Sequence, residues 1–188
     1  MGKEKELQKL NKKIRNCKKC PLWKTRKNTV PGEGPTNAKI MCVGQSPGAM
    51  ENKTGRPFIG PAGRFLNQLL KIAGIEREKI FITSPLKCLP QPPLNRKPTK
   101  KEIEDCLPYF KKQIEIINPQ KFILLGEIAF SVFFPKEKLN KFRGKWITLR
   151  QARGKKKYFI TYHPAAGLRF PKMRRILEKD FKNLSKSL

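Results

Sequence analysis

The sequence lacks three features, and each absence excludes a class of protein. No apolar run among the 188 residues approaches the roughly 20 that span a bilayer. The first six residues, MGKEKE, lack the apolar core of a signal peptide. Acidic side chains are scarce, because 14 Asp and Glu stand against 43 Lys and Arg, which gives a formal net charge of +29. We therefore expect neither a membrane protein nor a secreted one, but a cytoplasmic and strongly basic protein.

The composition predicts a folded domain with a polyanionic partner. Apolar residues at 38% and aromatic residues at 9% exceed what a disordered basic tail contains. The length fits one domain over residues 1–188. Positive charge favours nucleic acid, because binding releases counterions from the phosphates. One alternative is the Lys-rich surface of a thermophile, although thermophile proteins usually enrich Glu as well. Another is an anionic membrane surface, for which the sequence has no amphipathic anchor.

Five cysteines without an export signal argue against a disulfide framework. Cys42 lies in an apolar stretch, where a small buried thiol is the usual interpretation. Cys17 and Cys20 form a C-x-x-C pair, whereas Cys88 and Cys106 stand singly, each followed by Leu-Pro. A zinc ribbon normally has two close pairs. Four thiols from three segments suit an iron–sulfur cluster at least as well, and four unrelated thiols remain an alternative.

Hydrophobic periodicity predicts helices that alternate with strands. Helices are expected over residues 4–16, 63–73, 99–117, 129–133 and 171–184, and strands over 39–43, 79–83, 121–125, 146–149 and 158–161. The Gly- and Pro-rich stretches 51–63 and 85–98 are expected to be loops. This alternation predicts a three-layer α/β/α fold around a mostly parallel sheet.

Three unusual loops follow predicted strands, at residues 44–48, 84–96 and 163–169. Loops that leave the carboxyl ends of parallel strands meet at one edge of the sheet, so we expect one site there. Phe58, in an otherwise polar loop, either staples that loop or stacks on a planar ligand. His163 is the only histidine, and it is either structural or a donor of a proton or a hydrogen bond.

Motifs along most of the chain match a known family. They are Cys17-x-x-Cys20-Pro-Leu-x-x-Thr-Arg26, Val30-Pro-Gly-Glu-Gly34, Gly44-Gln-Ser-Pro-Gly48, Thr54-Gly-Arg-Pro-Phe-Ile-Gly60 with Ala62-Gly63, Lys87-Cys88, Pro92-Pro93, Asn95-Arg96, Cys106-x-Pro-Tyr109, His163-Pro-Ala-Ala166 and Leu168-Arg169. Through these motifs, from about Cys17 to Phe181, the chain resembles the family 4 uracil-DNA glycosylases, the iron–sulfur branch of the uracil-DNA glycosylase superfamily.

The resemblance implies a fold, a cofactor and a reaction. The fold is a four-stranded parallel sheet between helices, with a structural 4Fe-4S cluster held by Cys17, Cys20, Cys88 and Cys106. The reaction is hydrolysis of the N-glycosidic bond of uracil in double- or single-stranded DNA, on a base flipped into a pocket. The enzyme is expected to be a monofunctional glycosylase and a monomer, whose partner is DNA.

The resemblance also implies roles for individual residues. Phe58 would stack on the base, Gln45 and His163 would be catalytic, Leu168 would wedge into the base stack and Arg169 would hold phosphate. The implied substrate-binding residues are Gly44, Gln45, Ser46, Gly48, Phe58, Ser84, Asn95 and His163.

The chain departs from the family pattern at three positions. Gln45 and Asn52 replace acidic residues, and Ser84 replaces an Asn that reads the edge of the base. The Gly44–Gly48 motif therefore has no carboxylate to activate water. A Ser hydroxyl is shorter than an Asn amide and rotates, so we expect slower excision or broader specificity. The alternatives are a glycosylase for another modified base and a weakly catalytic protein that binds damaged or single-stranded DNA.

Overall fold

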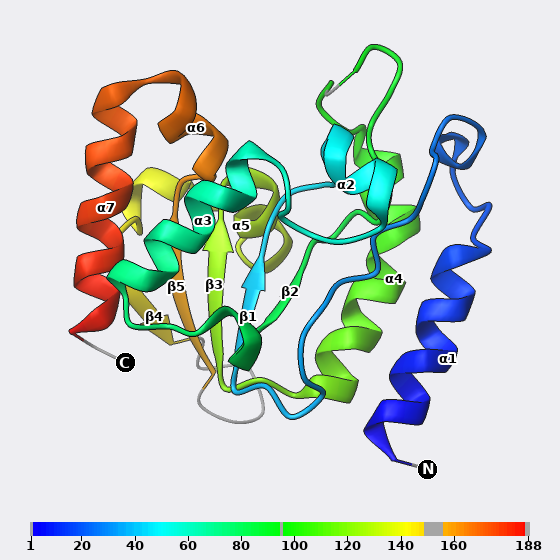
Figure 1. The fold of residues 1–188 in the computed structure, drawn as a ribbon, viewed down its shortest axis with the longest axis horizontal. Coiled ribbons are helices and arrows are strands. Elements are labelled where there is room, and N and C mark those ends of the chain that lie inside the picture. Colours follow the sequence, from blue (N-terminus) through cyan, green and yellow to red (C-terminus); the bar gives the residue numbers. More distant parts are fainter. Residues whose placement is uncertain (1, 95, 149–155, 187–188) are drawn as a thin grey trace.

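The computed structural model describes residues 2–94, 96–148 and 156–186, which fold around one five-stranded sheet (Figure 1). The strand order is β2-β1-β3-β5-β4. The bounds are β1 Ile40–Val43, β2 Phe81–Thr83, β3 Lys121–Leu125, β4 Trp146–Thr148 and β5 Lys157–Thr161. The first four strands in this order are parallel, and β4 pairs with β5 in antiparallel orientation. The expected mostly parallel α/β fold is confirmed, but the expected count of four strands is wrong because β4 adds an edge strand.

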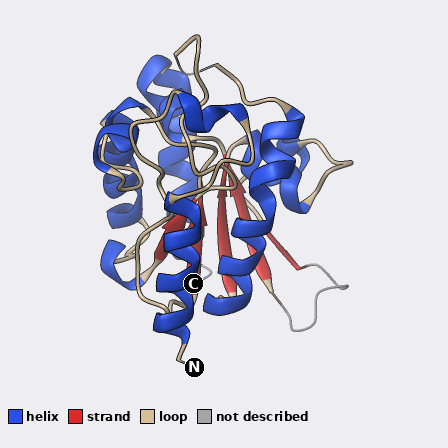
Figure 2. Ribbon diagram, turned by 90° about the vertical axis from the view of Figure 1, so that its right-hand side faces the viewer, coloured by secondary structure: helices blue, strands red, loops and turns tan. Residues whose placement is uncertain are grey.

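Helices cover both faces of the sheet (Figures 1 and 2). Their bounds are α1 Lys3–Arg15, α2 Ala49–Thr54, α3 Pro61–Ile72, α4 Lys100–Ile117, α5 Glu127–Phe133, α6 Pro164–Arg169 and α7 Pro171–Ser185. Side chains alternate between the faces along each strand, as the pleat requires. Met41 and Val43 pack in one core with α1, α4 and α5, whereas Cys42 between them packs in the other core with α3 and α7. The result is the expected three-layer arrangement.

The boundaries of the longer helices follow local sequence signals. Thr99 and Glu102 form the expected capping box of α4, in which Thr99 Oγ1 accepts from the Glu102 N–H at 3.2 Å and Glu102 Oε2 accepts from the Thr99 N–H at 2.8 Å. No helix in the described part of the chain is long and apolar enough to cross a membrane. Cys42 is fully buried, and burial raises the pKa of its thiol to about 12, as expected of a core cysteine.

Two short helices replace expected loops. α2 begins after Gly48 within the 44–63 region, and the Glu51 carboxylate fixes its start by accepting from the Gly48 N–H at 3.1 Å. α6 follows His163, whose ring nitrogen caps it, and Pro164 occupies its first position. Both helices lie at the carboxyl ends of parallel strands, at the top of Figure 1. The expected loops at 51–63 and 163–169 are therefore partly helical.

Candidate active site

The turn after β1 meets the ends of β3 and β5. Gly126 follows β3 with φ +88°, in the region that favours glycine. A Cβ on Gly126 would lie 2.4 Å from Gln45 Nε2 and 3.0 Å from His163 Cβ. Gln45 and His163 are therefore neighbours across Gly126, which only a residue without a side chain permits. Ser46, next to Gln45, is half-buried.

The Phe58 ring lies over this turn. Its centroid is 5.6 Å from that of the His163 ring, with 31° between the planes. A Cβ on Gly44 would lie 2.6 Å from the Phe58 ring, and one on Gly63 would lie 1.9 Å from the Phe58 carbonyl oxygen. Phe58 itself has φ +50°, a strained conformation for a residue with a side chain. The half-buried ring is thus held against Gly44 and His163.

Glu51 ties the two loops together, and the sequence had not singled it out. One carboxylate oxygen accepts from the Ile59 N–H at 2.9 Å and the Gly60 N–H at 2.8 Å, while the other accepts from the Gly48 N–H. Three donors occupy the carboxylate, so it positions the Gly48 turn and the Phe58 loop. No capping-box pattern in the sequence points to it, because Gly48 at the N-cap of α2 has no side chain to complete one.

His163 is a neutral donor in this setting. Its Nδ1 accepts from the Ala165 N–H at 3.2 Å, which leaves the proton of the neutral ring on Nε2. Burial lowers the pKa of the imidazole to about 4, although the negative charge of Glu51 opposes this shift. Of the two functional roles open from sequence, the geometry favours a hydrogen-bond donor over a proton donor.

Ser84 lies at the end of β2, next to Gly44, whose N–H donates to the Thr83 carbonyl at 2.8 Å. The buried Ser84 hydroxyl donates to the Leu86 carbonyl at 2.5 Å. The expectation that this hydroxyl rotates freely is therefore wrong, because its proton is committed and only its lone pairs remain available. Asn95 lies outside the described residues.

Two polar side chains hold the surrounding loops. The buried Lys87 ammonium donates to Thr83 Oγ1, the Ser84 carbonyl and Gln113 Oε1 at 2.6–2.7 Å, and burial lowers its pKa to about 7. It thereby joins the end of β2 to α4. Asn52 Oδ1 accepts from the backbone N–H of Lys27 at 2.9 Å, so this residue fastens the amino-terminal segment and does not face the site.

Leu168 and Arg169 lie in the last turn of α6, and both are exposed. His163 is the N-cap of α6, so these two residues lie on the short helix that begins directly after it.

The remaining cysteines meet at a second location. Cys17, Cys20, Cys88 and Cys106 line one small cavity, together with Arg26 and Tyr109. Arg26 Nη1 lies 3.5 Å from Cys88 Sγ. Burial raises the pKa of the Cys20 and Cys88 thiols, and raises that of Cys106 to about 12. Among the described residues no group of three or more His, Cys, Asp or Glu is arranged to hold a single metal ion. A polynuclear cluster is larger than one ion, and four thiols around a cavity match its donor set.

A family model described as the uracil DNA glycosylase superfamily matches residues 31–186. The chain belongs to the uracil-DNA glycosylase superfamily. A type-4 uracil-DNA glycosylase of Sulfurisphaera tokodaii is 45% identical over 184 residues, covering 95% of this chain and 83% of that protein. A type-4 uracil-DNA glycosylase of Pyrobaculum aerophilum is 46% identical over 180 residues, covering 93% of this chain and 91% of that protein. A type-4 uracil-DNA glycosylase of Thermotoga maritima is 40% identical over 178 residues, covering 91% of this chain and 88% of that protein. The resemblance seen in the motifs is confirmed.

Proposed function

We propose that this superfamily member is a DNA repair glycosylase that hydrolyses the N-glycosidic bond of uracil in DNA and leaves an abasic site. The observation that carries the proposal is the arrangement of Phe58, Gly44 and His163 at one rim of the sheet, in a chain 45% identical to a type-4 uracil-DNA glycosylase. A base in a duplex is out of reach of such a rim, so it enters as a flipped nucleotide.

The residues of the rim suit stabilisation of the leaving base. The uracil stacks on Phe58, and its carbonyl oxygens face the backbone of the Gly44–Gly48 turn. As the bond breaks, the base becomes an anion and the sugar gains oxocarbenium character. The Nε2–H of neutral His163 donates to the oxygen where negative charge develops, an interaction typically of about 3–4 kcal/mol in the transition state. Gln45 hydrogen-bonds water or base without taking a proton, because its side chain is an amide.

The four cysteines fit a 4Fe-4S cluster as their resident cofactor. Cys17, Cys20, Cys88 and Cys106 would hold it, and its contribution when bound is structural. Those residues lie after α1, in the loop after β2 and within α4. The thiolates would therefore add links among three segments that also share a small cluster of apolar contacts around Leu22 and Leu86.

The DNA contacts extend from the rim along α6. We infer that Leu168 enters the gap left by the flipped base and that Arg169 binds phosphate. We also propose that the enzyme acts as a monomer.

The function is tested with oligonucleotides that carry a single uracil, opposite guanine or in a single strand, followed by alkaline cleavage at abasic sites. We expect strand cleavage at the uracil position only. His163→Ala should reduce the single-turnover rate about 10²- to 10³-fold, because it removes the donor to the leaving base. Phe58→Ala should also reduce it, whereas Lys5→Ala, at the far end of α1, should not.

Other substrates distinguish the alternatives. Cleavage at hypoxanthine or at thymine opposite guanine, without cleavage at uracil, would indicate a shifted base specificity. Tight binding of abasic DNA without release of any base would indicate a non-catalytic DNA-binding protein. Either result contradicts the proposed function.

The cluster is tested on protein purified without oxygen. We expect a brown protein with about four irons per chain. Cys17→Ala and Cys106→Ala should each lose the iron and lower the melting temperature. Cys42→Ala is the matched control and should keep the iron, because its thiol lies in the opposite core. A colourless protein with one zinc per chain would contradict the cluster.

A further inference from the structure

Phe170, seven residues after His163, presents an aromatic ring to solvent. It joins α6 to α7 and is 59% exposed, and Leu168, two residues earlier, is 47% exposed. Hydrogen bonds fix its backbone on both sides. Its N–H donates to the Ala166 carbonyl at 3.1 Å, and its carbonyl accepts from the N–H of Met173 at 2.9 Å and of Arg174 at 3.2 Å. The ring is therefore held outward from a rigid junction between two helices.

The fold gains little from phenylalanine at this position. Phe170 is the N-cap of α7, and no side chain caps that helix. Ser, Thr, Asp and Asn are the residues that stabilise an N-cap, because their oxygen accepts from a free backbone N–H of the first turn. The backbone of Phe170, with φ −133° and ψ 116°, is already in the extended region that an N-cap adopts. Neither capping nor burial thus accounts for the ring.

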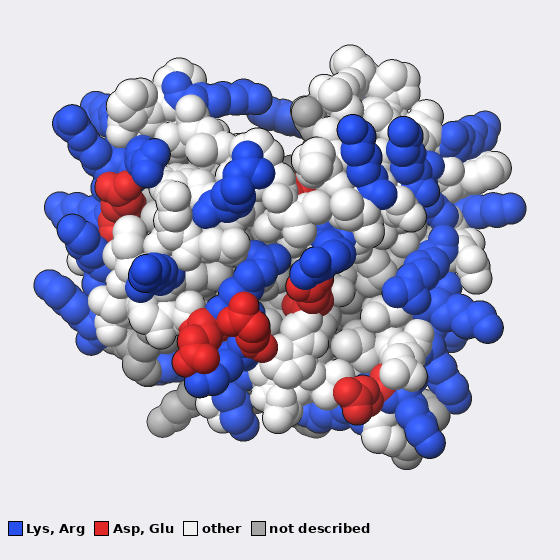
Figure 3. Space-filling view, in the orientation of Figure 1, with Lys and Arg blue, Asp and Glu red and all other residues white. Residues whose placement is uncertain are grey.

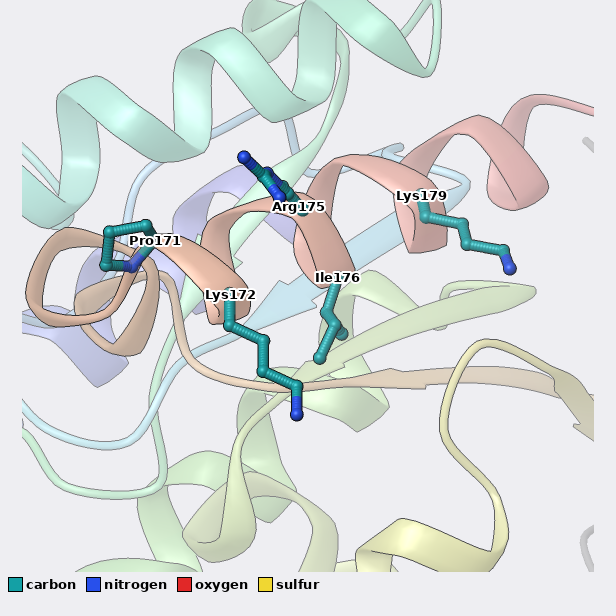
Figure 4. A pocket seen from close by; sticks show the side chains of 5 residues that line it. All are labelled: Pro171, Lys172, Arg175, Ile176 and Lys179. Atoms are coloured by element: carbon teal, nitrogen blue, oxygen red, sulfur yellow. The ribbon is translucent and has the colours of Figure 1, made fainter.

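The surroundings of the ring are cationic. Arg169 is exposed next to it. On α7 a shallow groove is lined by Lys172, Arg175 and Lys179, together with Ile176 and, at the start of the helix, Pro171 (Figure 4). These cations follow one another at intervals of three and four residues, so they lie along one side of the helix. An exposed ring beside a row of cations suits a nucleic acid strand, which offers phosphates for the cations and bases for the ring.

We propose that Phe170 is a DNA-stacking residue, which packs on a base next to the flipped nucleotide while Lys172 and Arg175 bind phosphates of the same strand. The proposal deepens the proposed function, because it assigns the DNA contacts that flank the pocket. Leu168 fills the gap in the base stack, and Phe170 covers the neighbouring base. Stacking on an aromatic face is tolerant of sequence, since every base has a π face.

The experiment compares Phe170→Asn with Phe170→Trp and with Ile72→Asn. Ile72 is an exposed apolar residue at the far end of α3, so it controls for the change from an apolar side chain to Asn. The readouts are the melting temperature and, by fluorescence anisotropy at fixed salt, the affinity for a uracil-free single strand and for a duplex with an abasic-site analogue.

Phe170→Asn should raise the melting temperature by about 2–6 °C, because Asn caps α7. It should also weaken DNA binding about 5- to 100-fold, because the stacked ring is lost. Phe170→Trp should keep the affinity, and Ile72→Asn should not change it.

Two results would overturn the proposal. One is unchanged DNA affinity in Phe170→Asn. The other is a fall in melting temperature together with the loss of affinity, which would mean that the ring packs within the fold. The readouts are binding to uracil-free DNA, so they remain informative if the protein excises no uracil. Failure of the proposed function and failure of this inference are therefore separate outcomes.

Discussion

At the scale of single residues, the direction of the Ser84 hydroxyl decides what this side chain can offer to a ligand. Its hydroxyl donates to the Leu86 carbonyl, so Oγ offers only lone pairs to a ligand. Such an acceptor matches the N3–H of uracil but gives nothing to O4, whereas an Asn amide has both a donor and an acceptor. One missing polar contact in a buried site typically costs about 1–3 kcal/mol.

Ser84→Asn should therefore raise the single-turnover rate on uracil by about one to two decades. Ser84→Ala is the matched control. It removes the hydroxyl and leaves the Leu86 carbonyl without its donor, so the rate should not rise and the melting temperature should fall. A slower Ser84→Asn enzyme would show that the serine is itself the favoured reader.

His163 should stay neutral through the pH range in which an ordinary histidine titrates. With a pKa of about 4, the folded protein binds no proton there, whereas the unfolded chain does so below about pH 6.5. Protons therefore favour the unfolded state between these values, and the free energy of unfolding should fall as pH decreases from 6.5 to 4.

The excision rate should show no His163-linked loss as pH rises from 6 to 8. The chain has one histidine, so a single imidazole signal in NMR reports the titration directly. A midpoint near 6.5 would contradict this prediction.

At the scale of elements, the sequence was sufficient where periodicity is long or buried. The spacing of Leu7, Leu10 and Ile14 predicted α1, and all three side chains are buried in the structure. The apolar runs at β1 and β3 predicted strands buried on both faces. The short elements were not predictable in this way. α2 and α6 have six residues each, and α2 depends on a carboxylate that also binds loop residues eight and nine positions further along.

The candidate site also divides into features that the sequence could predict and features that only the structure reveals. The motifs that contain Gln45, Phe58 and His163 could be identified from sequence, because family resemblance marks them. The structure was needed to place Gln45 and His163 on either side of Gly126, and to give Glu51 its three N–H donors. It was also needed to fix the direction of the Ser84 hydroxyl. Each of these depends on contacts between segments far apart in the chain, which no local pattern records.

At the scale of the whole molecule, basic side chains far outnumber acidic ones, 43 against 14. Figure 3 shows Lys and Arg side chains on both flanks of the upper rim, where the site lies, while most of the visible carboxylates lie in the lower half. Several of the 14 acidic groups are already paired, such as Glu102 with Arg96 and Asp180 with Arg143. The formal charge of +29 already subtracts all 14 acidic groups, so this excess of positive charge is available to a polyanion.

Binding to DNA should accordingly weaken steeply with salt, with the logarithm of the affinity falling linearly with the logarithm of the salt concentration. Each phosphate contact contributes about 0.7 to the slope on single strands and about 0.9 on duplex. Arg169→Ala should therefore reduce the slope by about that amount, because we propose that this exposed side chain binds one phosphate. Lys5→Ala removes the same charge at the opposite end of the molecule and should leave the slope unchanged. Titrations of both variants and the parent protein between 50 and 200 mM salt measure this. Equal slopes for all three would mean that Arg169 contacts no phosphate, and binding independent of salt would mean that the basic surface serves a purpose other than DNA.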